Sequence, residues 1–269
     1  CEPTRATLME KRAIAEIGWA KDALRRPGVE HDKATMRRAF AIIDDAGVLL
    51  TAVGARSWVH DSRVFLVPDA FRSFADLDAA TIDRASNPYV AYLEDVAILR
   101  VRGEGPRAVG VSITYLSQLL PGVTLIRKLR ERFPELPLVV GGAYLTSLGD
   151  EVARIPRSVL PVDAIVRNDG EAALDGWLAR TLGDAGGDVE SQNILLPSGD
   201  GFQRAQRGAF AHTDLDDLPV PSWTADGLEL DRYLVPRYPI PLPLSRGCYW
   251  GRCAYCNISS QTASSYRVR

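Results

Sequence analysis

The chain has 269 residues, enough for one large domain or about two ordinary ones. Hydrophobic residues make up 46% of it and charged residues 25%, a composition that argues against a disordered chain. The net charge of -2 argues against nucleic acid as a partner. Because no apolar run approaches the roughly 18 residues of a membrane helix, and the first residues lack the apolar stretch of a secretory signal, we expect a cytoplasmic protein that contacts no membrane.

Two amphipathic helices are predicted at the start of the chain. Apolar side chains recur at helical spacing over residues 8–26 and again over 33–46. We expect residues 1–84 to form a helical region that is part of the following domain or packs on it.

Residues 85–190 alternate between apolar strands and helices. The predicted strands cover residues 108–114, 137–142 and 162–168, and helices are predicted near them over 119–133, 144–155 and 171–182. Strands that are apolar almost throughout and are each followed by a helix indicate a parallel sheet buried on both faces. The predicted fold is therefore α/β, with a doubly wound parallel sheet of the Rossmann-like, flavodoxin-like kind.

The rest of the chain is predicted to be a connection followed by the beginning of a second domain. Residues 191–238 combine a hairpin, whose turn is the "SGDG" of the stretch 183–210, with a linker rich in proline from Pro219 to Pro243. Within residues 239–269, "PIPLPLS" (239–245) is predicted to be a strand that leads into a cysteine-rich loop.

Polar and glycine residues follow each of the three predicted parallel strands. After the first come Ser112, Thr114, Tyr115, Ser117 and Gln118; after the second Gly141, Gly142, Ala143 and Tyr144; after the third Asn168, Asp169, Gly170 and Glu171. Each group alone has an ordinary structural explanation as a turn or a helix start. Because ligands of open parallel sheets bind at the carboxyl ends of the strands, the three groups together predict a ligand site. No phosphate loop and no correctly placed dinucleotide fingerprint accompanies them.

Three of the four cysteines, Cys248, Cys253 and Cys256, lie within "SRGCYWGRCAYCNIS" (245–259). Three thiols so close in sequence do not resemble a disulfide framework. A structural zinc site needs four ligands, so zinc remains an alternative only if a fourth ligand comes from elsewhere. An iron-sulfur cluster held by three cysteines, with one iron left open for a substrate or cofactor, is the favoured interpretation.

The cysteine segment resembles the cluster-binding segment of the radical S-adenosylmethionine (radical SAM) superfamily. Together with the upstream sheet sequence and "LDDLPVPSW", it is similar to the cobalamin-dependent radical SAM enzymes over roughly residues 85–269. The resemblance implies that the domain of residues 85–190 binds cobalamin, and that residues 239–269 begin a radical SAM barrel of the TIM type. It also implies a 4Fe-4S cluster on the three cysteines, S-adenosylmethionine beside Tyr255 and Asn257, and cobalamin against the strand-end residues named above.

Two features depart from related proteins. Four residues separate Cys248 from Cys253, whereas the superfamily usually has three. No D-x-H-x-x-G motif is present, since Val29, Trp58 and Phe210 stand two residues before the three histidines. The resemblance therefore implies cobalamin without a histidine on its lower face, which is consistent with methyl transfer.

The reaction implied is methylation of an unactivated carbon of a peptide or natural product, through a 5'-deoxyadenosyl radical and methylcobalamin, with an external electron donor of the flavodoxin or ferredoxin type. A cobalamin-dependent cyclase or rearrangement enzyme is one alternative, and a non-catalytic cobalamin-binding or zinc-binding module is another. The chain is expected to be an excerpt of a longer protein that does not by itself cleave S-adenosylmethionine.

Overall fold

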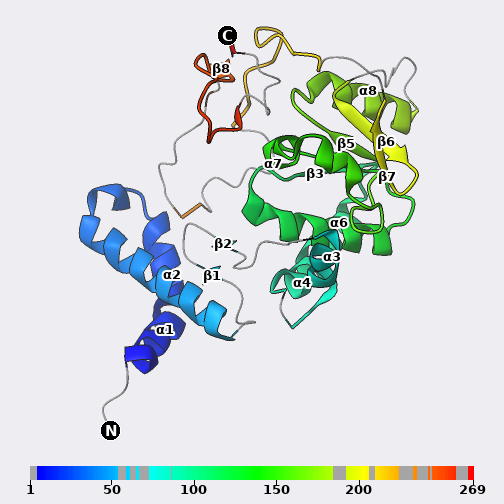
Figure 1. Ribbon diagram of the computed structural model, residues 1–269. Helices are drawn as coiled ribbons and strands as arrows, with labels where there is room; N and C mark the ends of the chain where they lie inside the picture. Colours follow the sequence, from blue (N-terminus) through cyan, green and yellow to red (C-terminus); the bar gives the residue numbers. More distant parts are fainter. Residues whose placement is uncertain are drawn as a thin grey trace. The chain divides into compact units, whose positions relative to one another are not determined.

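The computed structural model describes residues 5–53, 59–60, 65–66, 73–85, 87–183, 192–205, 210–223, 233–234, 242, 244–258 and 266–269. They belong to two compact units (Figure 1). The first is Cys1–Ala70 with Val220–Leu242, and the second is Phe71–Pro219 with Pro243–Arg269. The proline-rich segment predicted as a linker thus belongs mostly with the first unit. None of the described helices is long and apolar enough to cross a bilayer.

The first unit is built on two long helices, as predicted. Helix α1 (Arg5–Arg25) and helix α2 (Lys33–Val53) are joined by a turn and the short helix η1 (Val29–His31). The turn passes through Gly28, whose φ of 86° suits glycine. Small buried side chains such as Ala20, Ala23 and Ala39 let the helices approach closely, and Leu24 and Ile42 fill the rest of the shared core. Strands β1 (Val59–His60) and β2 (Phe65–Leu66) form an antiparallel pair.

A mixed five-stranded sheet organises the second unit (Figure 1). Its order is β3-β4-β5-β6-β7, with bounds Val109–Ser112, Leu138–Gly141, Ala164–Val166, Ile194–Ser198 and Gly201–Arg204. Strands β3, β4 and β5 are parallel, at the positions predicted for the parallel sheet. The predicted hairpin is also present, with Ser198 paired to Gly201 across its turn.

The sheet is not parallel throughout, because β6 pairs antiparallel with β5. The hairpin therefore extends the sheet, where the sequence predicted that it would hang from it. Ile194 and Leu195 are fully buried, so β6 can continue the apolar core that β5 begins. The result is an α/β fold compatible with a Rossmann-like domain, with two antiparallel strands at one edge.

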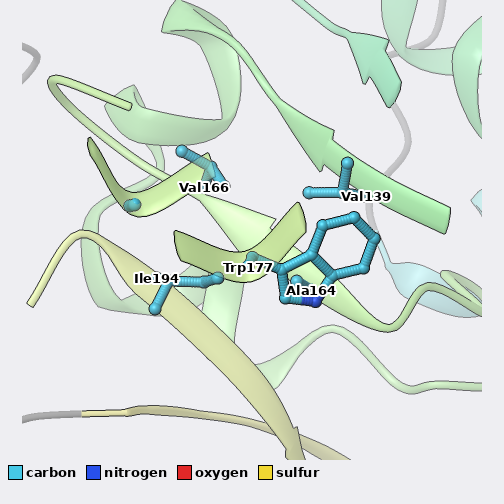
Figure 2. Packing of buried hydrophobic residues seen from close by; sticks show 6 residues of the cluster. Val139, Ala164, Val166, Trp177 and Ile194 are labelled. Carbon is cyan, nitrogen blue, oxygen red and sulfur yellow. The ribbon is translucent and has the colours of Figure 1, made fainter. Parts of the chain in front are cut away.

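Helices cover opposite faces of the sheet. Helix α6 (Leu119–Arg132), preceded by η3 (Leu116–Gln118), packs on the face of Val111 and Ile113, close to Gly122. Helix α8 (Glu171–Leu182) packs on the other face, where Trp177 lies in a cluster with Val139, Ala164, Val166 and Ile194 (Figure 2). Both helices end within a residue of their predicted bounds.

The helix predicted over 144–155 is divided. Helix α7 covers only Ala143–Ser147, and the 3-10 helix η4 follows over Gly149–Arg154. Gly149 has a φ of 61°, a conformation that interrupts an α-helix.

An outer layer of helices, which the sequence did not predict separately, packs on α6. It consists of α3 (Phe74–Ile82), α4 (Tyr89–Tyr92), the π-helix η2 (Leu93–Ala97) and α5 (Ile98–Glu104). The Asn87 side chain donates to the Thr124 hydroxyl of α6 at 3.0 Å, and Lys128 of α6 pairs with Glu94 at 3.3 Å. These contacts tie the outer layer to the sheet.

Two short strands flank the cysteine segment. Strand β8 (Ser245–Arg246) pairs antiparallel with β9 (Arg267–Val268). Of the strand predicted over 239–245, residues 239–241 and 243 lie outside the described residues, and only Ser245 is in a strand.

Candidate functional site

A cleft of about 430 Å³ lies at the carboxyl ends of β3, β4 and β5, a volume in the range of small-molecule sites. Its walls are mostly apolar, with one hydroxyl and one carboxylate. The residues that line it are Gly110, Val111, Ser112, Val139, Val140, Gly141, Gly142, Val166, Gly170, Glu171 and Leu174. The cleft thus lies at the edge of the sheet where the sequence predicts a ligand site.

The cleft exists because α8 covers β4 and β5 and leaves β3 open on the same face. Gly110 and Ser112 alternate with half-buried valines along β3, and both are exposed. Val139, which pairs with Gly110, is already buried beneath Trp177. The exposed side of β3 is thus the floor of the cleft and α8 is one wall.

The four glycines that line the cleft differ in how much space the structure leaves for a side chain. At Gly142, whose φ is 115°, a Cβ would lie 2.4 Å from the Ile113 carbonyl oxygen, and at Gly170 it would lie 2.6 Å from Val166 Cγ1. Gly141 would place it 3.1 Å from the Val166 carbonyl oxygen. The packing of the protein itself therefore disfavours a side chain at Gly142 and Gly170, and leaves a tight contact at Gly141. At Gly110 a Cβ would meet only Val139 Cγ1, at 3.6 Å, an ordinary contact. A side chain at Gly110 would occupy the cleft without displacing protein atoms.

The structure brings only some of the predicted strand-end residues into the cleft. Those that line it are Ser112, Gly141, Gly142, Gly170 and Glu171. The others do not line it: Thr114, Tyr115, Ser117, Gln118, Ala143, Tyr144, Asn168 and Asp169. Several of these have a structural task, since the Gln118 side chain accepts the N–H groups of Thr114 and Tyr115, and Asn168, at φ 56°, donates its N–H to Thr146.

Sequence reasoning missed the apolar residues and Gly110. Glycine inside a strand, at a position that alternates with valines, was the available signal for an open face.

Asp169 is the centre of an ion-pair cluster beside the cleft. Its side chain is only 6% exposed. The Arg267 guanidinium binds both of its carboxylate oxygens, and Arg246 Nη1 lies 3.1 Å from Oδ1. The N–H of Thr213 donates to Oδ2 at 2.9 Å. Glu171, which lines the cleft, accepts from Arg246 and from the Thr213 hydroxyl. Residues distant in sequence therefore share one buried charge centre.

Charge partners dominate the protonation of the two acids. Burial by itself raises the pKa of Asp169, but the hydrogen bond from Arg267, the Thr213 N–H and the charges of Arg267 and Arg246 lower it below its usual 3.8. Burial likewise raises the pKa of Glu171, and the hydrogen bond and charge of Arg246 outweigh it, so that the pKa lies below 4.5. The hydrogen bond to Glu171 raises the pKa of Arg246. All three groups are charged at neutral pH.

The stability of the second unit is expected to fall in acid through Asp169. Since the folded-state pKa is below the unfolded value of 3.8, its contribution is complete above that value and is lost as the pH falls through the folded pKa. His212, whose Nδ1 lies 3.9 Å from Asp169, is the other titratable neighbour besides Glu171. Unfolding in urea between pH 7 and pH 3 measures the loss.

The Asp169→Asn variant should be less stable at pH 7 by about 1–2 kcal/mol, because it removes the buried carboxylate on which the half-buried Arg246 and Arg267 converge, while Arg246 keeps Glu171 and Arg267 keeps the Thr213 carbonyl. It should also show a weaker dependence on acid. Asp175→Asn, on the exposed side of α8, is the matched control and should leave the profile unchanged. An unaltered acid profile in the Asp169 variant would contradict this account.

The three cysteines are free thiols in an open segment. Cys248 and Cys253 are half-buried and Cys256 is exposed. The Cys256 N–H donates to the Cys253 carbonyl at 3.1 Å, which forms a tight turn between them. Tyr255 is 92% exposed, Tyr249 packs edge to face on Tyr266 at 6.1 Å, and Asn257 is exposed. Gly247 and Gly251 have φ values of 91° and 59°.

Within the part of the chain that the structure describes, no three Cys, His, Asp or Glu side chains converge closely enough to hold a metal ion. The donor chemistry still suits an iron-sulfur cluster, because three free thiols lie within nine residues, with Gly251 in a left-handed conformation among them and Gly247 directly before them. Metal binding is commonly coupled to local folding, so the thiols would gather as the metal binds.

No protein-family model, no curated protein and no solved structure matches this chain.

Proposed function

We propose that the chain belongs to a cobalamin-dependent radical SAM enzyme that methylates an unactivated carbon of a peptide or other natural product. The single observation that carries the proposal is the ion pair between Arg246 and Glu171. Arg246 stands two residues before Cys248, and Glu171 lines the strand-end cleft. A three-cysteine segment and an apolar cleft at a sheet edge are thus held beside each other.

The cleft suits the nucleotide tail of cobalamin better than the whole cofactor. Its volume of about 430 Å³ is smaller than a complete cobalamin, and its floor at Gly110 and Ser112 leaves room for a flat group. Valine side chains and Leu174 would contact the ring of such a group, and the Ser112 hydroxyl would bind a polar edge. The sequence offers no D-x-H-x-x-G histidine, and the resemblance to cobalamin-dependent radical SAM enzymes implies cobalamin bound with its own base displaced; a cleft that takes the tail apart from the corrin would be consistent with this.

Cys248, Cys253 and Cys256 would hold a 4Fe-4S cluster with an open iron for S-adenosylmethionine. When bound, the cofactors supply one-electron reduction of S-adenosylmethionine and methyl transfer. The protein binds and orients them: the exposed Tyr255 ring is available to lie against the adenine, and Asn257 offers a polar side chain beside it. The proposal also includes a peptide or other natural product as the substrate and an external electron donor of the flavodoxin or ferredoxin type.

Cofactor loading of the 269-residue chain tests the proposal. After anaerobic reconstitution with iron and sulfide, we expect about four iron atoms per chain, and binding of cobalamin with the absorption spectrum of a detached lower base. If the chain instead holds one zinc and no iron, the proposal is wrong and the cysteine segment is a zinc-binding module. If the chain binds cobalamin but no iron, it is a cobalamin-binding module only. If it binds neither cobalamin nor iron, both cofactor assignments are wrong. Product analysis of the whole enzyme separates methyl transfer from cyclisation or rearrangement.

A further inference from the structure

Strands β8 and β9 pair in a way that is unfavourable on its own. The ladder has only two residue pairs, and one of them places Arg246 directly opposite Arg267. Directly opposed residues of an antiparallel pair point to the same face, and like charges there destabilise the pair. A ladder of two residues is also marginal without outside support. An anion on that face is therefore required to hold the two strands together.

Asp169 and Glu171 supply that anion. Arg246 and Arg267 both bind Asp169, and Arg246 also binds Glu171, so two positive and two negative charges are brought together. The two acids come from the end of β5 and the start of α8, elements that belong to the sheet core. We call these four residues the clasp. Its acids belong to the sheet domain, whereas its arginines stand in β8 and β9, the two strands that flank the cysteine segment.

We infer that Asp169 and Glu171 are positioning residues that hold both ends of the cysteine segment against the edge of the cleft. Sequence reasoning assigned both acids to cobalamin contacts, but their carboxylates are engaged by the clasp arginines. Cys248 follows Arg246 by two residues, so closing the clasp places the first thiol next to the wall of the cleft that Glu171 forms. The identity of the metal that the thiols bind rests on the proposed function; the positioning does not.

An exchange of charges tests the clasp. In the chain without metal, Arg246→Glu is expected to place a third acid beside Asp169 and Glu171, to open the clasp, and to raise the rate of alkylation of the half-buried Cys248 by about tenfold. Peptide mass spectrometry follows each thiol separately. The exposed Cys256 should change little. Adding Glu171→Arg to Arg246→Glu restores one ion pair in the opposite direction but leaves a carboxylate at position 246 beside Asp169, so it should return the Cys248 rate part of the way to that of the unaltered chain.

Arg252→Glu is the matched control, since it reverses the charge of an exposed arginine within the same segment, outside the clasp. Urea unfolding of every variant separates loss of the clasp from loss of the fold. If Arg246→Glu folds and Cys248 reacts at the original rate, the inference is wrong. Rescue by the exchange is the outcome that a merely destabilised segment would not show.

Metal loading gives a second, independent result. Reconstituted Arg246→Glu should hold less iron or show an altered electron paramagnetic resonance signal, and the exchanged pair should recover part of the iron or of the original signal. If the unaltered chain binds no iron, the proposed function fails while the alkylation result still decides on the clasp. If the chain binds iron and cobalamin but alkylation is insensitive to Arg246, the proposed function stands and the clasp does not.

Discussion

Substitution of Cys248, Cys253 or Cys256 by alanine is expected to abolish iron loading of the chain. Each variant retains two thiols, which cannot hold a cluster that needs three protein ligands, so iron should fall from about four atoms per chain to a small residue. Iron and sulfide analysis after anaerobic reconstitution measures the loss. Because Cys256 is exposed and Cys253 half-buried, neither substitution removes core packing, and the free energy of unfolding without metal should be nearly unchanged.

Cys1→Ala is the control for this experiment, since it removes the one cysteine outside the segment. It should load as much iron as the unaltered chain. Full loading of the Cys256→Ala variant would contradict the assignment of that residue as a ligand. Retention of one zinc by all three variants would show that metal binds elsewhere.

Filling the cleft at Gly110 is expected to have the second largest effect. Gly110→Val should reduce the affinity for cobalamin by about a hundredfold or more, because the new side chain occupies the floor where the nucleotide tail would lie. The fold should tolerate it, since a Cβ there meets only Val139 at an ordinary 3.6 Å. Valine also favours a strand, so the free energy of unfolding should stay the same or rise by about 0.5–1 kcal/mol.

The graded variant Gly110→Ala should weaken binding less than valine does. Cobinamide, which lacks the nucleotide tail, provides the matched ligand and should bind the unaltered chain and Gly110→Val equally. If Gly110→Val loses affinity for cobalamin and for cobinamide equally, the corrin ring rather than the nucleotide tail lies in the cleft. Unchanged cobalamin affinity in a folded Gly110→Val variant would remove the cleft from the proposed site.

Local pattern was sufficient for the strands of the central sheet and for the four longest helices. Continuous valine-rich runs bounded by turns predicted β3, β4 and β5, and apolar side chains at helical spacing predicted α1, α2, α6 and α8, because periodicity and turn residues act over a few positions. The same logic predicted a cleft at the edge where the carboxyl ends of the parallel strands meet, and a cleft lies there. The "SGDG" turn predicted the hairpin for the same reason.

Tertiary structure decided what those elements pair with. Whether the hairpin hangs from the sheet or joins it depends on the buried edge of β5, which no local signal in β6 reveals. The role of the Asp169 side chain also could not be predicted from the sequence. An acid that follows a strand can bind a ligand, cap a helix or form an ion pair. Only folding brings Arg246 and Arg267, 77 and 98 residues further along, onto its carboxylate.

By itself, then, the sequence determined the α/β class, the order of the parallel strands and their helices, and the presence of three thiols within nine residues. Only the tertiary structure decided that the sheet is mixed, that Gly110 forms an open floor, and that two acids at the sheet edge hold the cysteine segment. The physical reason is range: periodicity and turn chemistry act between near neighbours, whereas pairing of strands and of buried charges acts between residues that meet only after the chain has folded.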